Sequence, residues 1–262
     1  MKLTIVKLGG SAITRKKENL LEVNRPVLGR LAGEIAEALA KKRMRLIVVH
    51  GAGPYGHVSA KRYELGKGLK GPEQVKGMAL THQRMEELNF QVVAALLDAG
   101  VNAIAFQPSA AGVLEDGRLV SFPIESIGRL LDLGLVPVAY GDVLPDLKRG
   151  LSILSGDHLI PYLAGKLAAD RVIITTSHNG IFDRDPEEKG ARKYDIVDEK
   201  IVGELDFRAA KGTDVTGGIG GKVRELMALS RHGVSSEIIS AMEPGYLRRA
   251  LLGETGIGTR II

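Results

Sequence analysis

The sequence predicts an α/β fold in which helices cover both faces of a mostly parallel sheet. Short apolar segments rich in β-branched residues recur along the chain, and segments with a helical period lie between them. Strands and helices that alternate in this way form parallel sheets through crossover connections. The chain has 262 residues, of which 44% are apolar and 26% are charged, and this is enough to bury such a core.

Six segments have the composition of buried strands: residues 3–8, 46–50, 103–106, 136–140, 171–175 and 236–240. The first helix is expected to begin after Asn24, a capping residue, with Pro26 in its first turn. Its core-facing stripe is Leu28, Leu31, Ile35 and Leu39. A second helix is expected to end at Gly100, and its stripe is Met85, Leu88, Val92 and Leu96.

Two more helices are expected in the second half of the chain. One covers residues 155–170, where Pro161 is expected to bend the first turns. The other covers residues 219–231 and ends at Gly233. The charged segment 183–212 has no strong period, and we expect a small hairpin and a short helix there rather than a separate domain.

The composition narrows the functional classes. There are 33 glycines but only 4% aromatic residues and no Trp, which argues against recognition of nucleic acid by stacking. The net charge of +5 is typical of a slightly basic surface or of a protein with an anionic ligand such as a phosphate compound. No long run of Lys and Arg indicates a nucleic-acid partner. The absence of cysteine excludes disulfides, thiolate nucleophiles and cysteine-based zinc sites.

The sequence also bears on location and source. No stretch approaches the roughly 18 apolar residues that a membrane span requires, and the first residues lack a signal-peptide pattern. We therefore expect a cytoplasmic protein without a membrane partner. Asn and Gln are scarce and Cys is absent, which suggests a heat-adapted source, and a melting temperature in the mesophile range would contradict this hypothesis.

Glycines gather in three clusters that follow predicted strands or open a helix. The clusters are Lys-Leu-Gly-Gly-Ser at 7–11, His-Gly-Ala-Gly-Pro-Tyr-Gly-His at 50–57, and the segment 212–222 that ends in Gly-Gly-Lys. Ligands of open α/β sheets bind at the carboxyl ends of strands, where glycine lets backbone N–H groups approach phosphate oxygens. One such cluster is usually an ordinary turn, but three clusters with lysines favour phosphate binding. Neither the P-loop pattern nor, at the first strand, G-x-G-x-x-G is present.

These motifs, together with Tyr-Gly-Asp at 140–142 and Ser-Gly-Asp at 155–157, occur in the order typical of the amino acid kinase superfamily. The chain resembles that superfamily over nearly its whole length. Within it, the segments 53–57 and 214–218 are most similar to the isopentenyl phosphate kinases. His57 is the specific element, because the amino-acid and carbamate kinases of the superfamily do not carry a histidine there.

The resemblance implies an open three-layer αβα sandwich with a mostly parallel central sheet. Residues 1–170 would form an N-terminal lobe that binds the phosphate acceptor, and residues 171–262 a C-terminal lobe that binds ATP, within one continuous fold. The implied reaction is ATP-dependent phosphorylation of isopentenyl phosphate to isopentenyl diphosphate in isoprenoid biosynthesis, with ATP and Mg²⁺ and in a homodimer. An acceptor phosphate is largely dianionic at neutral pH, so catalysis is expected to consist of positioning and positive charge, without a general base.

The resemblance assigns roles to individual residues. Catalytic roles fall on cations at three positions, on one carboxylate that holds them and on one histidine: Lys7, Lys16, Lys222, Asp157 and His57. Lys16 could equally be a solvated loop lysine, and Asp142 either a supporting partner or a turn residue. The residues expected at ATP are Lys7, Gly9, Gly10, Ser11, Gly53, Ser177, Gly217, Gly218, Gly221 and Lys222. Those expected at the acceptor are Gly51, Ala52, Gly53, His57, His82, Ile153 and Gly156.

The apolar tail of the acceptor is expected between the helix around residues 75–88 and the segment before Ser155. Candidates there are Val75, Met78 and Ala79, which an ordinary core would also contain. No residue is assigned as a metal ligand.

One loop departs from the family pattern. The family usually has Thr-Asp-Val-Asp-Gly where this chain has Thr-Ser-His-Asn-Gly at 176–180, so Ser177 and Asn179 replace two carboxylates. We expect altered contacts to the nucleotide. Two alternatives remain open: a fosfomycin-type or other small phosphate or phosphonate kinase of the superfamily, and a nucleotide-binding regulatory protein without turnover.

Overall fold

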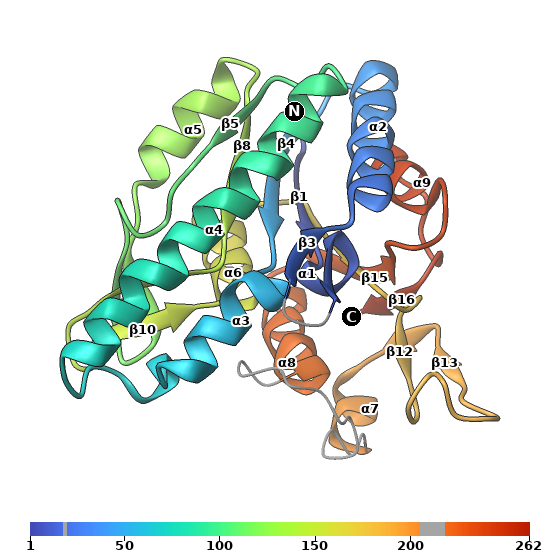
Figure 1. Ribbon diagram of the computed structural model, residues 1–262. Helices are drawn as coiled ribbons and strands as arrows, with labels where there is room; N and C mark the ends of the chain where they lie inside the picture. Colours follow the sequence, from blue (N-terminus) through green and yellow to red (C-terminus); the bar gives the residue numbers. More distant parts are fainter. Residues whose placement is uncertain (18–19, 205–217) are drawn as a thin grey trace.

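The computed structural model describes residues 1–17, 20–204 and 218–262 of the chain (Figure 1). Its central sheet has eight strands in the order β14-β16-β15-β11-β1-β4-β8-β5. The six predicted strands are confirmed to within one residue at each end. They are β1 (Leu3–Leu8), β4 (Arg45–His50), β5 (Ala103–Ala105), β8 (Val136–Tyr140), β11 (Arg171–Thr176) and β15 (Ser235–Ser240). The sheet is mostly parallel; β16 (Thr259–Ile261) and the edge strand β14 (Ile196–Val197) extend it, and β16 runs antiparallel to β15.

Helices cover both faces of this sheet, so the predicted three-layer αβα sandwich is confirmed. The apolar core on one face holds residues of α2 (Arg25–Lys41), α4 (Pro72–Asp98) and α9 (Tyr246–Leu252). The core on the other face holds residues of α5 (Ile124–Asp132), α6 (Gly156–Lys166) and α8 (Gly218–Ser230). The short helices α1 (Gly10–Ile13) and α3 (Gly53–Arg62) follow β1 and β4, and η1 (Leu65–Lys67) follows α3 (Figure 1). Within the described residues, no helix combines the length and the apolar character that crossing a membrane requires.

The predicted helices are present, with two corrections. Asn24 precedes α2 as expected, but its side chain does not cap the helix; its Nδ2 donates to the Ala12 carbonyl oxygen at 3.0 Å. The helix α6 ends at Lys166 instead of about residue 170, and Pro161 lies inside it. Gly100 follows α4 with a φ of +86°, a conformation that favours glycine at the end of a helix.

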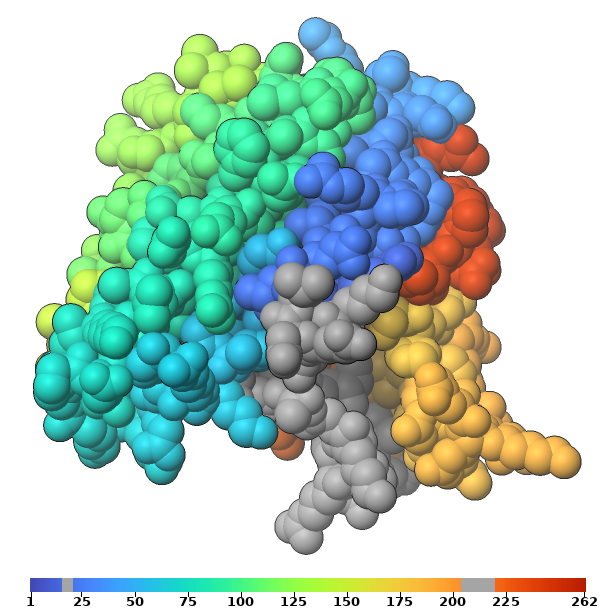
Figure 2. Space-filling model, in the orientation of Figure 1, coloured from blue at the N-terminus to red at the C-terminus, as the bar shows by residue number. Residues whose placement is uncertain are grey.

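A second, four-stranded sheet was not predicted. It consists, in order, of β10 (Gly150–Leu154), β9 (Asp142–Asp146), β6 (Val113–Glu115) and β7 (Arg118–Ser121). A small hairpin of β2 (Thr14–Lys17) and β3 (Leu20–Val23) follows α1. The expected excursion at 183–212 contains β13 (Lys193–Tyr194) and the short helix α7 (Glu199–Glu204), and β13 forms a hairpin with β12 (Ile181–Phe182), which lies just before the excursion. Figure 2 shows this orange segment at the lower right, standing out from the body.

The alternation of side chains along β1 positions the first functional residue. Leu3 and Ile5 belong to the core on the side of α6 and α8, whereas Val6 and Leu8 belong to the core on the side of α2 and α4. Because successive side chains of a strand point to opposite faces, Lys7 lies on the same face as Ile5. Its side chain therefore extends toward α6 and α8 at the carboxyl end of the sheet.

Candidate active site

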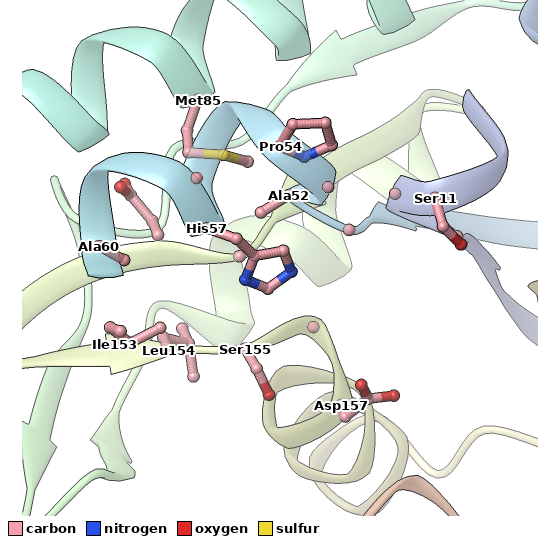
Figure 3. Close-up of a pocket in the computed structure, with 18 of the residues that line it drawn as sticks. Ser11, Ala52, Pro54, His57, Ala60, Met85, Ile153, Leu154, Ser155 and Asp157 are labelled. Atoms are coloured by element: carbon pink, nitrogen blue, oxygen red, sulfur yellow. The ribbon is translucent and has the colours of Figure 1, made fainter. Parts of the chain in front are cut away.

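A cavity of about 790 Å³ lies at the carboxyl ends of β1 and β4. It is lined by the loops that follow these strands, by α3, by β9 and β10, and by the start of α6. Two residues of α4, the last three of β11 and Lys222 of α8 complete the described lining. Figure 3 shows α3 on one side of the cavity and β10 with the start of α6 on the other. Most residues that the sequence assigned to ATP or acceptor meet here: Lys7, Gly9, Gly10, Ser11, Gly51, Ala52, Gly53, His57, Ile153, Gly156, Asp157 and Lys222.

The two N-terminal glycine loops touch each other backbone to backbone. A Cβ atom at Gly10 would collide with the backbone nitrogen of Gly53, and one at Gly51 would lie 2.7 Å from the nitrogen of Gly10. Gly53 has a φ of +50° and borders the same contact. Glycine is therefore required for the loops to approach each other, as well as for any approach of phosphate to their N–H groups.

Two lysines and one carboxylate form the polar centre of the cavity. Lys7 Nζ lies 2.7 Å from Asp157 Oδ1, and Lys222 Nζ lies 3.2 Å from Asp157 Oδ2. The side chains of Lys7, Lys222 and Asp157 are only 7%, 12% and 11% exposed, respectively. Burial alone would raise the pKa of Asp157, but the two ammonium groups outweigh burial and hold that pKa well below its usual value. The carboxylate is therefore charged throughout the physiological range and fixes both cations in the cavity.

The helices α6 and α8 supply two members of this centre. Ser155 precedes α6 and its Oγ accepts a hydrogen bond from the His158 backbone nitrogen at 3.3 Å, which makes it a capping residue. Asp157 then lies in the first turn, where the helix dipole favours a negative charge. Lys222 lies in the second turn of α8 and reaches Asp157 from the other side.

His57 lies on the side of the cavity opposite this centre. It belongs to α3, is half-buried, and its imidazole points into the space between α3 and the start of α6 (Figure 3). The glycine loop that precedes it and the short helix both line the cavity. His57, Lys7 and both glycine loops therefore border the same cavity.

One end of the cavity is apolar. It is lined by Ala60 of α3, Met85 of α4, Val143 of β9, and Ile153 and Leu154 of β10. Of the residues proposed for the tail, only Ile153 lines the cavity; Met78 packs behind it, and Val75 and Ala79 are exposed on α4. The expectation for Val75, Met78 and Ala79 is therefore corrected, because a different face of α4, that of Thr81 and Met85, borders the cavity.

Known proteins are similar to this chain over almost its whole length. The model of the amino acid kinase family matches residues 2–240. The isopentenyl phosphate kinase of Methanothermobacter thermautotrophicus is 42% identical over 99% of this chain and 98% of the relative, and that of Haloferax volcanii is 37% identical over 94% and 96%. The chain belongs to the isopentenyl phosphate kinases of the amino acid kinase family.

Solved structures agree with this assignment. An isopentenyl phosphate kinase structure matches with a TM-score of 0.86 at 38% identity, over 99% of this chain and all of the other. The Thermoplasma acidophilum enzyme in its product complex matches with a TM-score of 0.77 at 26% identity, over 100% of both chains. The carbamate kinase of Giardia lamblia, at 17% identity and a TM-score of 0.71 over 100% of this chain and 98% of the other, shares the fold.

Several residues assigned to the site by this family's pattern lie elsewhere. His82 does not line the cavity; its Nδ1 lies 2.9 Å from Asp142 Oδ2, and Asp142 is the residue that reaches the cavity wall. Asp142 is not a turn residue, since it begins β9 and its Oδ1 also accepts from the Val143 nitrogen at 2.8 Å. The hydrogen bond to Asp142 outweighs burial and raises the pKa of His82.

Of the other residues expected at ATP, Ser177 and Gly221 do not line the cavity, although Thr176 beside Ser177 does. Gly218 begins α8, and its surroundings lie outside the described part of the structure. Gly217 and the side chain of Lys16 lie outside the described residues.

The departure at Asn179 has a structural reason. Its Nδ2 donates to the Ile257 carbonyl at 3.0 Å and its Oδ1 accepts from the Ser240 nitrogen at 3.1 Å. A carboxylate cannot donate, so only an amide makes both bonds.

Sequence reasoning missed one residue that holds the first glycine loop. Thr175 is fully buried, and its Oγ1 donates to the Lys7 carbonyl at 3.0 Å and accepts from the Gly9 nitrogen at 3.3 Å. A Cβ atom at Gly9 would collide with the Thr175 carbonyl. The only signal in the sequence is a polar residue at the end of an apolar strand. Lys61 and Arg62 also line the cavity and were not singled out.

Proposed function

We propose that this chain transfers the γ-phosphoryl group of ATP to isopentenyl phosphate, forming isopentenyl diphosphate and ADP. One observation carries the proposal: a single cavity joins the Lys7–Asp157–Lys222 centre, two glycine loops and His57 to an apolar end. The polar part suits two phosphate groups that meet, and the apolar part suits a short hydrocarbon tail. Membership of the isopentenyl phosphate kinases supports the same acceptor.

The chemistry requires charge neutralisation and alignment. An oxygen of the acceptor phosphate forms a bond to the γ-phosphorus as the bond from that phosphorus to the β,γ-bridging oxygen breaks, and ADP leaves. We propose that Lys7 and Lys222 stabilise the charge on the transferred group, while Asp157 holds both ammonium groups in place. His57 donates a hydrogen bond to the acceptor phosphate, and the N–H groups of Gly10 and Gly53 approach the phosphate oxygens.

Mg²⁺ enters this proposal as part of the nucleotide. Mg²⁺ prefers oxygen ligands and commonly combines one or two carboxylates with substrate phosphates. Both carboxylates in the described lining of the cavity are already engaged, Asp157 by two lysines and Asp142 by His82. We therefore assign no residue as a metal ligand, and the nucleotide phosphates and water would hold the ion.

The lobes and the assembly also belong to the proposal. Residues 1–170 contribute His57, Ile153 and the acceptor end of the cavity, and residues 171–262 contribute Thr176 and Lys222. We propose that these segments bind acceptor and ATP, respectively. A homodimer is supported by Phe90 and Leu97, which lie two turns apart on α4 and are 70% and 52% exposed.

An ADP-release assay with MgATP tests the function. The acceptors are isopentenyl phosphate, dimethylallyl phosphate, fosfomycin, glutamate, carbamate and UMP, each at several concentrations. We expect the highest kcat/KM with isopentenyl phosphate, and a loss of about 100-fold in His57→Ala with little change in the KM for ATP. Preference for fosfomycin, or no ADP release with any acceptor, would contradict the proposal.

A further inference from the structure

The helix α3 presents a second cation on the face that carries His57. Pro54, His57 and Lys61 recur at steps of three and four residues, and all three line the cavity. Four residues along a helix correspond to a rotation offset of about 40° and a rise of about 6 Å. Because helical side chains lean toward the N-terminus, the Lys61 side chain leans from its own turn back toward that of His57.

The charge of Lys61 is not balanced by the described part of the chain. Within it, Lys61 forms no ion pair and is exposed at the cavity rim. The other described cations of the lining differ: Lys7 and Lys222 share Asp157, and the guanidinium of Arg62 lies over the Tyr63 ring, 5.4 Å from its centroid. Lys61 is thus available to an anion that enters the cavity.

The charge balance of the reaction calls for such a cation. The centre of Lys7, Lys222 and Asp157 has a net charge of +1, and it must serve the γ-phosphoryl group of ATP. The acceptor phosphate adds nearly two negative charges at neutral pH. The imidazole of His57 offers the acceptor a hydrogen bond, whereas a lysine adds a full positive charge.

We propose that Lys61 is a further acceptor-binding residue, which pairs with the phosphate of the acceptor beside His57 and favours acceptors that carry a dianionic head. The inference rests on the proposed function, since it names a partner for the same acceptor. Its distinguishing feature is selectivity: Lys61 acts on the acceptor and not on ATP, and it acts on binding more than on turnover.

Three variants test the proposal. Lys61→Met removes the charge and keeps an unbranched side chain, and Lys61→Arg keeps the charge. Lys76→Met is the matched control, because Lys76 is an exposed lysine of the neighbouring helix α4 that does not line the cavity. The measurements are the Kd of isopentenyl phosphate by calorimetry without nucleotide, steady-state kinetics with MgATP, and thermal stability.

For Lys61→Met we expect the Kd and KM of isopentenyl phosphate to rise about tenfold at low salt and less at 0.5 M salt, because exposed charge pairs are screened. The kcat, the KM for ATP and the melting temperature should stay close to those of the wild type. Lys61→Arg should restore most of the affinity, and Lys76→Met should resemble the wild type.

Equal Kd values for Lys61→Met and Lys76→Met would overturn the proposal, as would a KM for ATP that rises as much as the KM for the acceptor. The wild-type reaction separates this failure from failure of the function. If the wild type binds isopentenyl phosphate without phosphorylating it, the proposed function is wrong and the Kd values still decide the role of Lys61. If the wild type does not bind isopentenyl phosphate, both proposals are overturned.

Discussion

Replacing Asp157 by Asn tests the polar centre most directly. The change removes one negative charge and keeps the shape of the side chain. In the folded protein it leaves two ammonium groups, 7% and 12% exposed, facing an amide that holds them with hydrogen bonds only. Removing one partner of a buried ion pair costs about 3–5 kcal/mol, because the remaining charge stays buried without compensation. Here two cations remain, so we expect a loss within or above that range.

Urea denaturation at pH 7 measures this loss, and Asp132→Asn is the control. Asp132 also pairs with a cation, Arg45 at 3.1 Å, but it is 62% exposed, and such surface pairs contribute about 0–1 kcal/mol. The phosphate groups of ATP should replace the negative charge that the two lysines have lost in Asp157→Asn. Saturating MgATP is therefore expected to raise the melting temperature of this variant more than that of the wild type. The kcat should fall about 100- to 1000-fold, because the lysines are no longer fixed. A loss of stability no larger than that of Asp132→Asn would refute the reasoning.

Three further predictions concern stability. Burial lowers the pKa of His50 to about 4, so the contribution of neutral His50 to the free energy of unfolding is complete above pH 6.5 and is lost as the pH falls toward 4. The protein should therefore lose about 3 kcal/mol of stability between pH 7 and pH 4. Denaturation at both pH values measures this loss, and His50→Phe should abolish it. For Asp146, burial is outweighed by backbone N–H groups, those of Arg149, Gly117 and Lys148, which lower its pKa to about 2. Asp146→Asn should therefore be less stable to unfolding than the wild type by about 2 kcal/mol at pH 7. This difference should shrink as the pH falls from 4 to 2, and equal stability at pH 7 would show that the hydrogen bonds to Asp146 are unimportant. Thr81→Val should raise the melting temperature by a few degrees, because the buried Thr81 hydroxyl has no hydrogen-bond partner among the described residues; a lower melting temperature would contradict this.

The sheet could be predicted because its strands are buried on both faces. Segments such as 171–176 and 235–240 are short and rich in β-branched residues, and such continuous apolar runs are typical of strands buried in a parallel sheet. The functional loops were found for a related reason. Glycines 9, 10, 51 and 53 lie where two backbones touch, a requirement that other residue types cannot meet and that is therefore visible in the sequence.

The second sheet could not be predicted from its sequence. Its strands are three to five residues long, β9 contains Pro145, and β6 and β7 together offer little apolar alternation. The sheet depends on the pairing of β6 with β9 through Leu114 and Asp146, which are distant in the chain, and on the packing of β9 against α4. This sheet forms one wall of the cavity, so the position of Val143 was not expected either.

The errors at the site come from the rotation of one helix. The sequence indicates that residues 75–88 are helical, and 100° of rotation per residue separates the exposed face of Val75 and Ala79 from the face of Thr81 and Met85. A single sequence does not show which of two partly apolar faces meets the ligand. The same rotation applies to His82: its neighbour Thr81 lines the cavity, whereas His82 turns toward Asp142, which does line it.

The ionisation of the centre implies a particular pH dependence of the reaction. Asp157 stays charged because its pKa is held well below the usual value. It does not change its charge near neutral pH and therefore does not make the activity depend on pH there. The acceptor phosphate changes its charge with a pKa of about 6. We expect kcat/KM for the acceptor to rise with pH through about 6 and then to level off. Fluorination next to phosphorus lowers the second pKa of a phosphonate, so a difluoromethylene phosphonate acceptor should shift the rising limb to lower pH. If the limb stays in place, a group of the enzyme titrates instead of the acceptor. His57 lines the cavity, and loss of the limb in His57→Asn would identify His57 as that group.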